Sequence, residues 1–404
     1  MPRLRSCGLI PVLLPAMLLT FADPAGATSG RLRSLGGQAD FLEDDANVLR
    51  WYGSLIDYPQ QVVLELGDLN HDTGGSLTSR LNRQGGGLHA QFDPAGRWGT
   101  GAVYFGEDLP LPERGGWINL VWARRCGRIG MGAAFRGTSF SEAGNRNDED
   151  LDGQSCFTHS LGLGLRWDLA SGLYADLALE ANQAEVDYFH NQRGITISEN
   201  GGWDSFAARG RVFHGLTERL AAVYRLDWSR QERPLVDNTF DDLVDLDADI
   251  FRGGAGINYL PDADRLLIVS VDFDRREEDR RARHPIFARY ERGRRDWWRL
   301  DVRCGVEARL LPWLSVRAAS RYRRTVDESL VSYDWSGGYR ESTYSYAIRV
   351  ETPVTVGVGL HVGPFDGDVV FNDIAPLDRG YLLTAADSGG RAPRYSAATL
   401  VYRF

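Results

Sequence analysis

The chain has 404 residues and a formal net charge of −9, and all of its basic residues are arginine. Its acidity argues against nucleic acid as a partner. After residue 27 no apolar run approaches the ~20 residues that a membrane helix needs. A β-barrel is not excluded by this, because its strands alternate lipid-facing apolar and lumen-facing polar residues and therefore look mildly polar overall.

The N-terminus is typical of an export signal. Arg3 and Arg5 precede a short apolar run at residues 9–19, and Ala25 and Ala27 supply the small residues of a cleavage site. The run is too short to cross a bilayer as a helix. We therefore expect residues 1–27 to be a signal peptide, residues 28–61 a periplasmic N-terminal segment, and residues 62–404 the main domain.

From residue 62 onward apolar side chains recur with a period of two, as expected for β-strands. In residues 298–310, Val302 and Val306 share one face with the other apolar residues, and Asp301 and Arg303 share the opposite face with other charged ones. The alternating stretches span about nine to thirteen residues, whereas strands in soluble sandwiches are usually ~5–6 residues long. The longer strands suit a tilted crossing of a membrane.

Two kinds of connection alternate along the chain. Short turn-like segments occur at residues 93–97, 125–128, 168–172, 215–218, 261–264, 311–312 and 364–367. Longer polar stretches lie near residues 70–84, 106–115, 137–155, 188–202, 230–248, 277–293, 325–341 and 374–392. This pattern predicts an all-β fold, a transmembrane antiparallel up-and-down β-barrel of about sixteen strands with short periplasmic turns and long extracellular loops. The range is fourteen to eighteen, because residues 344–362 keep one alternation through Pro353.

The positions of the aromatic residues support a location in the cell outer membrane. Nine of the eleven tryptophans fall near the ends of expected strands, where two interfacial girdles would lie. Tyr402 and Phe404 end the last alternating stretch, a pattern similar to the signal that the outer-membrane barrel assembly machinery recognises. We therefore expect contacts with that machinery, with outer-membrane lipid and with lipopolysaccharide.

A short N-terminal stretch resembles a known family. Ser-Leu-Gly-Gly-Gln-Ala at 34–39 is followed by Glu-Asp-Asp-Ala-Asn at 43–47 and then by an apolar patch. Residues 34–67 thus resemble the start of the fatty-acid-transporter-like (FadL-type) barrels, which follow an Asp-Asp-Ala step with Asn-Pro-Ala. That last element is absent here, and the family's usual fourteen strands differ from sixteen. The resemblance implies that residues 28–61 fold inward as a plug.

One acidic motif has the spacing of a calcium loop. Asp148, Asp150 and Asp152 occupy alternate positions before Gly153, as in the opening of a calcium-binding loop. The bidentate glutamate expected twelve positions along is replaced by His159. A solvated acidic loop is the alternative, and no other cofactor is expected.

Charged residues of both signs are expected to face the lumen. Mixed signs favour ion pairs between neighbouring strands, whereas a ladder of arginines could attract anionic solutes. The candidate lumen residues are Arg209, Arg211, Arg225, Asp227, Arg252, Asp272, Asp274, Arg299, Asp301, Arg303, Glu307, Arg317 and Arg321.

Little in the sequence points to an enzyme. His159 and Ser160 are neighbours, so on a strand they point to opposite faces and cannot act as a base and nucleophile. We expect a passive channel or transporter for small solutes. The alternative is a non-conducting barrel that serves as a secretion, assembly or surface-interaction partner. Cys126, Cys156 and Cys304 are expected to remain free thiols, because their places in the barrel are too far apart for a bridge.

Overall fold

The computed structural model describes residues 29–67, 83–93, 96–108, 114–146, 150–192, 195–237, 242–284, 289–335, 340–352, 354–371 and 395–404. The expected signal peptide and Asp148 lie outside these residues. In the described part of the chain, seventeen strands form one sheet. All neighbours are antiparallel, and the sheet closes because β17 pairs with β1 while β9 pairs with β10. The expected antiparallel barrel is confirmed.

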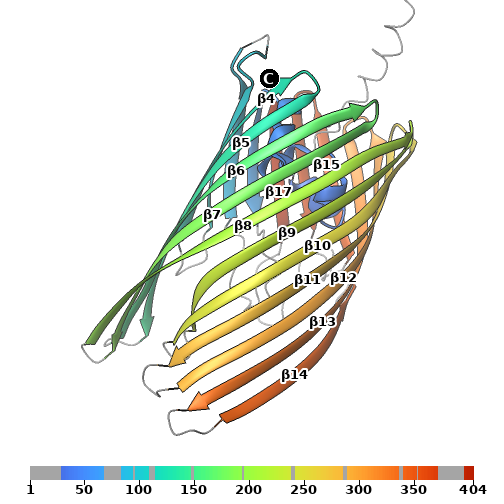
Figure 1. The fold of residues 1–404 in the computed structure, drawn as a ribbon. Coiled ribbons are helices and arrows are strands. Elements are labelled where there is room, and N and C mark those ends of the chain that lie inside the picture. Colours follow the sequence, from blue (N-terminus) through green and yellow to red (C-terminus); the bar gives the residue numbers. More distant parts are fainter. Residues whose placement is uncertain are drawn as a thin grey trace, which may run out of the picture.

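The strands follow one another around the wall, as Figure 1 shows. Their bounds are β1 Gln61–Gly67, β2 Arg83–Gln91, β3 Thr100–Asp108, β4 Arg114–Cys126, β5 Ile129–Arg146, β6 Asp150–Ala170, β7 Leu173–Gln192, β8 Ile195–Thr217, β9 Leu220–Asp237, β10 Asp242–Asp262, β11 Arg265–His284, β12 Arg289–Leu311, β13 Leu314–Trp335, β14 Arg340–Glu351, β15 Val354–Val362, β16 Phe365–Phe371 and β17 Tyr395–Arg403.

The wall has sixteen positions, because β14 and β15 pair with the same neighbour. Arg323 to Asp334 of β13 pair with β14, and Leu314 to Ser320 pair with β15. The alternation over residues 344–362 thus belongs to a single wall position that is interrupted between Glu351 and Val354. Proline has no N–H to donate to a ladder, and the sequence has Pro353 in this gap.

The strands are longer than the sequence pattern predicts. Strands β5 to β13 contain 18 to 23 residues. Much of what the pattern assigns to long outer loops, such as residues 277–284 and 289–293, is therefore strand. The reason is that these segments are polar on both faces, so the period of two is lost although the backbone ladder continues, as at Asp245 opposite Arg281. Figure 1 shows these extensions projecting away from the end that carries the C-terminus.

The short turns fall where the sequence predicts them. Gly127, Gly172 and Gly363 have φ values of 62°, 73° and 61° and connect consecutive strands. Two-residue hairpins with the twist of the flanking strands need positive φ, which glycine adopts without steric cost. These tight turns mark one end of the barrel.

The outward face of the barrel has an apolar belt, and a band of aromatic residues lies at each edge of this belt. Trp98, Trp122, Trp167 and Trp313 are exposed beside the short turns, and Phe206, Trp228, Phe251 and Phe273 are exposed at the other edge. On β12 the belt runs over the twelve steps from Trp298 to Leu310. At ~3.3 Å per residue and a tilt of ~45° this is ~28 Å, close to the ~25 Å apolar band of outer-membrane barrels.

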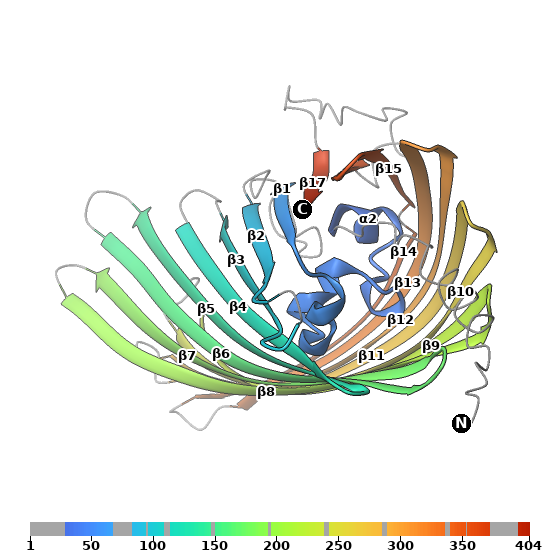
Figure 2. The same cartoon turned by 90° about the horizontal axis from the view of Figure 1, so that it is seen from above.

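The interior contains the first described residues, 29–58, as Figure 2 shows. They form a short helix and three 3-10 turns, with bounds α2 Ser29–Ser34, η1 Ala39–Phe41, η2 Asp45–Leu49 and η3 Tyr52–Asp57. We call residues 29–58 the inner segment. Across the described ranges, no helix has the length and apolarity to cross a membrane.

Two of the three cysteines after the signal region can be placed. Cys126 and Cys304 are free thiols and are exposed. Cys156 lies in β6, and its side chain is outside the described part of the chain. The expectation of three free thiols stays a prediction.

The extent of the apolar belt can be tested with two outward-facing residues, one within the belt and one beyond its outer edge. Val302 lies within the belt, and Leu330 is an outward residue on the β13 extension, where it pairs with Arg294. Val302→Arg is expected to destabilise the barrel by ~2–4 kcal/mol, and Leu330→Arg by at most ~1 kcal/mol, because the cost of a charge falls away from the bilayer midplane. Urea unfolding in lipid vesicles measures both. Equal losses of stability would mean that no bilayer covers the belt.

Candidate functional site

The inner segment packs against the wall through two apolar clusters. In the first, Val48, Trp51 and Leu55 are fully buried against inward residues of β3, β4 and β7, among them Tyr104 and Val121. Burial of side chains of this size contributes ~1.5–3 kcal/mol each. The inner segment is therefore held as a packed element of the interior.

The second cluster involves other inward residues of the wall. Leu35, Phe41 and Leu42 of the inner segment pack against inward residues of β8, β9 and β11, including Phe213 and Ile268. Asn258 Nδ2 donates a hydrogen bond of 2.7 Å to the Phe41 carbonyl oxygen. Two separate patches of the wall thus contact the same short segment.

Glycines of the wall allow the close approach. A Cβ at Gly164 would lie 2.9 Å from the Gly53 nitrogen, and one at Gly132 would overlap the Tyr52 carbonyl. A Cβ at Gly256 would lie 2.7 Å from the Phe41 ring. Because real Cβ atoms do not approach other atoms so closely, the absence of side chains at these positions makes room for the inner segment.

A charged cluster at Arg166 joins the inner segment to the wall. Arg166 donates to Asp176 at 2.8 and 3.0 Å, and the same guanidinium contacts Glu43 and Asp57 of the inner segment at 2.5 Å. The predicted lumen residue Arg211 also donates to Asp176, at 2.8 Å. One buried carboxylate therefore orients two arginines.

A second charged cluster surrounds Glu307. Arg31 of the inner segment donates to Glu307 at 2.8 Å, and Arg317 of the wall donates to the same carboxylate at 3.0 Å. Arg317, which is fully buried, also contacts Asp368. Removing one partner of such a pair would leave a buried unpaired charge, at a cost of ~3–5 kcal/mol.

The third charged cluster lies at η1 and η2. Arg225 pairs with Asp272 at 3.0 Å and also contacts Asp40 of the inner segment. Arg50 pairs with Asp40 at 2.7 Å and contacts Asp227 on the wall. Arg50, Arg225 and Arg211 outweigh the effect of burial and lower the pKa of Asp40 to about 2.

The other predicted lumen residues form pairs within the wall. Asp301 accepts from Arg303, Arg321 and Arg323 at 2.9 to 3.2 Å. The remaining contacts are Arg303 with Asp272 at 2.9 Å, Arg209 with Glu180 at 2.7 Å, Arg252 with Asp274 at 3.3 Å, and Arg299 with Asp274 and with Asp301. All thirteen candidate residues thus take part in ion pairs.

Several residues of this network were not among the candidates. The partners on the inner segment, Arg31, Asp40 and Arg50, carry no local signal, since they lie in a six-residue helix and in or beside short 3-10 turns. Arg166 could have been found, because strand alternation places it inward and its register partner on β7 is Asp176.

The remaining candidate residues do not join the site. Tyr402 and Phe404 face outward and their rings stack at 6.2 Å, and their role in assembly stays a prediction. Of the acidic motif, Asp150 and Asp152 fall in β6 with side chains outside the described part. Within the ranges that the structure covers, no group of three or more His, Cys, Asp or Glu side chains could hold a metal ion.

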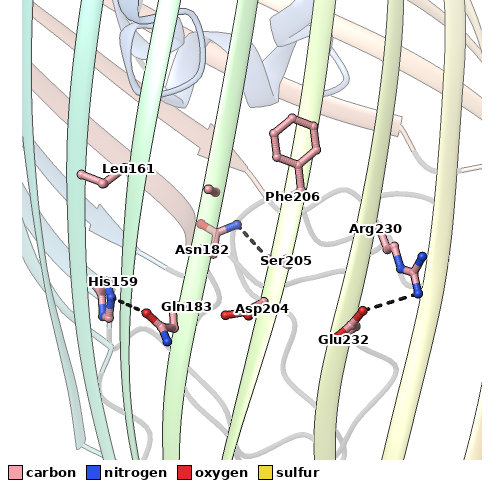
Figure 3. A pocket seen from close by; sticks show the side chains of 10 residues that line it. His159, Leu161, Asn182, Gln183, Asp204, Ser205, Phe206, Arg230 and Glu232 are labelled. Carbon is pink, nitrogen blue, oxygen red and sulfur yellow. Dashed lines mark hydrogen bonds and ion pairs between the residues drawn. The ribbon is translucent and has the colours of Figure 1, made fainter.

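A cavity on the outer surface of the wall is separate from the lumen. Figure 3 shows it beside His159, Leu161, Gln183, Phe206 and Arg230. Leu161, Phe206 and Arg230 are on the outward face. This depression spans the edge of the apolar belt and does not lie on a path through the barrel.

Two adjacent carboxyl groups of the inner segment are buried beside the seam of the barrel. Asp45 accepts a hydrogen bond of 3.1 Å from Gln61 at the start of β1. Burial raises the pKa of Asp45 to about 7, although Arg403 opposes the shift. Burial and the neighbouring Asp45 hold the pKa of Asp44 well above its usual range, against the attraction of Arg31. Both groups are therefore poised to bind protons at neutral pH or below.

Comparison with known proteins gives structural likeness alone. No protein-family model matches the chain, and no curated protein matches it. The chain is similar to the solved toluene transporters TbuX of Ralstonia pickettii and TodX of Pseudomonas putida. Identity to TbuX is 12% over 94% of this chain and 99% of that one, with a TM-score of 0.41; identity to TodX is 9% over 93% and 96%, with a TM-score of 0.42.

CdiB from Escherichia coli is a further similar structure. It is 10% identical over 86% of this chain and 63% of its own, with a TM-score of 0.48. At these levels of identity and structural similarity the matches carry no argument about function.

Packing of the inner segment can be tested with two glycines on one strand. Gly256→Val is expected to push Phe41 away and increase trypsin cleavage after Arg31 and Arg50. The control is Gly253→Val, where a Cβ would meet nothing closer than 3.8 Å. It should leave cleavage unchanged. The measurement is limited proteolysis of the folded protein, and equal protection in both variants would contradict the tight packing.

The buried acid pair predicts a pH dependence of this docking. Because the pKa values of Asp44 and Asp45 are raised in the folded state, their contribution to stability is fully present below ~pH 4. It is lost as the pH rises through about 7, the value for Asp45.

Trypsin should therefore cleave after Arg31 and Arg50 more readily as the pH rises. Brief digestion at several values between about pH 5 and pH 8 measures this. The double variant Asp44→Asn/Asp45→Asn removes both titrating groups and should show the same protection throughout. A wild-type protein whose protection rises with pH would contradict the assignment.

Proposed function

We propose that the protein is an outer-membrane β-barrel that transports small solutes, with the inner segment acting as a plug that moves to open the lumen. A closed antiparallel wall with an outward apolar belt supports insertion in a bilayer, where a closed barrel leaves no backbone group unpaired. The short turns would face the periplasm. The extensions of β5 to β13 would face the outside, in contact with lipopolysaccharide.

The main support for a movable plug is the way in which its ion pairs are shared. Arg166 contacts Glu43 and Asp57 of the inner segment but also Asp176 of the wall. Arg225 contacts Asp40 but also Asp272. When the inner segment leaves, both wall arginines keep a carboxylate, and of the wall carboxylates named here only Asp227 loses its partner, Arg50.

The carboxylate of Glu307 is also shared between the inner segment and the wall. It loses Arg31 on release but keeps Arg317. The ladders of the wall involve no backbone group of residues 29–58, and the connection to β1 is only residues 59–60. The barrel can therefore remain folded while the inner segment changes position.

A second function rests on the height of the wall. Strands β5 to β13 extend far beyond the inner segment (Figure 1) and would present a large external surface. This supports the alternative of a non-conducting barrel that serves as a secretion, assembly or surface-interaction partner. The two functions differ in whether solutes cross when the plug is free.

A disulfide lock can test the movement of the plug. A Cβ at Gly256 would lie 3.3 Å from Phe41 Cβ, near the ~3.5–4.5 Å that a disulfide joins. The double variant Phe41→Cys/Gly256→Cys is reconstituted in liposomes, and swelling with small sugars and carboxylates reports flux. Flux is expected to be low when oxidised and several-fold higher after reduction.

Phe41→Cys alone controls for the lost ring and for the native thiols, and its flux should not depend on reductant. Equal flux in the oxidised and reduced double variant would mean that the inner segment is not a gate. No flux in either form, with the reduced segment open to trypsin, would favour the non-conducting alternative.

A further inference from the structure

A cavity of about 100 Å³ opens on the inner face of the wall where β7 to β10 pass the inner segment. Its inward-facing lining is mainly polar. The polar members are Asn182, Ser205, Arg209, Asp227, Ser229, Gln231 and Arg252, and the apolar ones are Ala207 and Ile250. Arg50 of the inner segment contacts Asp227 there. The cavity thus lies where a solute entering the lumen would meet the plug.

Around this cavity the two signs of charge differ in exposure. The arginine side chains are 22% exposed at Arg209, 28% at Arg50 and 39% at Arg252. The carboxylates are 6% exposed at Glu180, 3% at Asp274 and 8% at Asp227, which lines the cavity. Since the carboxylates are covered, the charge that solvent and solutes meet is that of the guanidinium groups.

The arginines also outnumber the carboxylates that they contact. Glu180 is contacted by Arg136 at 3.8 Å and by Arg209 at 2.7 Å. Asp274 is contacted by Arg252 and Arg299. Arg209 and Arg252 each share one carboxylate with a second arginine, so donors of their guanidinium forks remain available to a ligand.

We propose that this cavity binds the oxyanion group of a small hydrophilic solute, a carboxylate or a phosphate. The inference rests on the proposed function, since it names the class of solute that the lumen takes. Arg209 and Arg252 would contact the anion, because the planar guanidinium fork matches carboxylate and phosphate oxygens. Ser229 and Gln231 would donate to the remaining oxygens.

Other solute classes fit the lining less well. A hydrocarbon would have to desolvate Arg209, Asp227 and Gln231 without replacing their hydrogen bonds, which is costly. A cation would meet guanidinium groups before it could reach the buried carboxylates. The exposed guanidinium groups of the cavity are therefore complementary to an anion.

The chain offers substitutions that remove one guanidinium without orphaning a carboxylate. Arg252→Gln leaves Asp274 with Arg299, and Arg209→Gln leaves Glu180 with Arg136. Both arginines are partly exposed, so either variant should fold. Arg265→Gln, at a turn and 68% exposed, removes the same charge far from the cavity and is the matched control.

The experiment measures binding by calorimetry to the full-length protein in detergent micelles, with ionic strength held constant by sodium chloride. The probes are inorganic phosphate, succinate and, as a neutral comparison, glucose. Binding of phosphate or succinate but not glucose is expected. Affinity should fall roughly tenfold in Arg252→Gln and in Arg209→Gln, the loss of one charge-assisted hydrogen bond, and Arg265→Gln should match the wild type.

Which of the two anions binds distinguishes a phosphate solute from a carboxylate solute, and either result supports the site. Arg252→Lys keeps the charge and should recover part of the affinity. Glucose binding equal to that of the anions, no binding of either anion, or anion binding unaffected in both glutamine variants would overturn the inference. This experiment measures binding and not flux. The anion site would therefore be supported even if the disulfide lock showed that the inner segment is not a gate.

Discussion

The structure depends on one constraint, which is that every strand segment inside a bilayer must have a neighbour on both sides. In a bilayer no water can satisfy a free edge, so the sheet has to close. Closure occurs at the short pairing of β1 with β17, from Gln61 opposite Arg403 to Gly67 opposite Ala397. Once the ring is closed, alternation divides every strand into an outward apolar face and an inward face, and the inward face sets the chemistry of the lumen.

The inner segment follows from what that inward face presents. Near the short turns the wall offers glycines and small apolar residues, so a chain can approach within contact of its backbone. Between these patches lie buried carboxylates and arginines that need partners. A segment with Trp51 and Phe41 for the patches, and with Arg31 and Asp40 for the charges, satisfies both requirements at once.

Alternation in the sequence predicts much of this, because it depends on neighbouring residues only. It correctly places Val302 outside and Asp301 inside, and glycines such as Gly127 mark the tight turns. It fails where a strand leaves the belt and becomes polar on both faces, as in residues 277–284. It also cannot pair Arg31 with Glu307, which are 276 positions apart. Such contacts depend on closure of the whole ring.

The polar cavity and the plug are not independent, because Arg50 belongs to both. It pairs with Asp40 within the inner segment and with Asp227 at the cavity. If the plug moves, this guanidinium moves with it, while Arg209 and Arg252 stay on the wall. A solute shifts the position of the plug only if it binds the two arrangements with different affinity. An anion that needs Arg50 would hold the plug in place, whereas one that binds only Arg209 and Arg252 would bind both arrangements alike and leave the position of the plug unchanged.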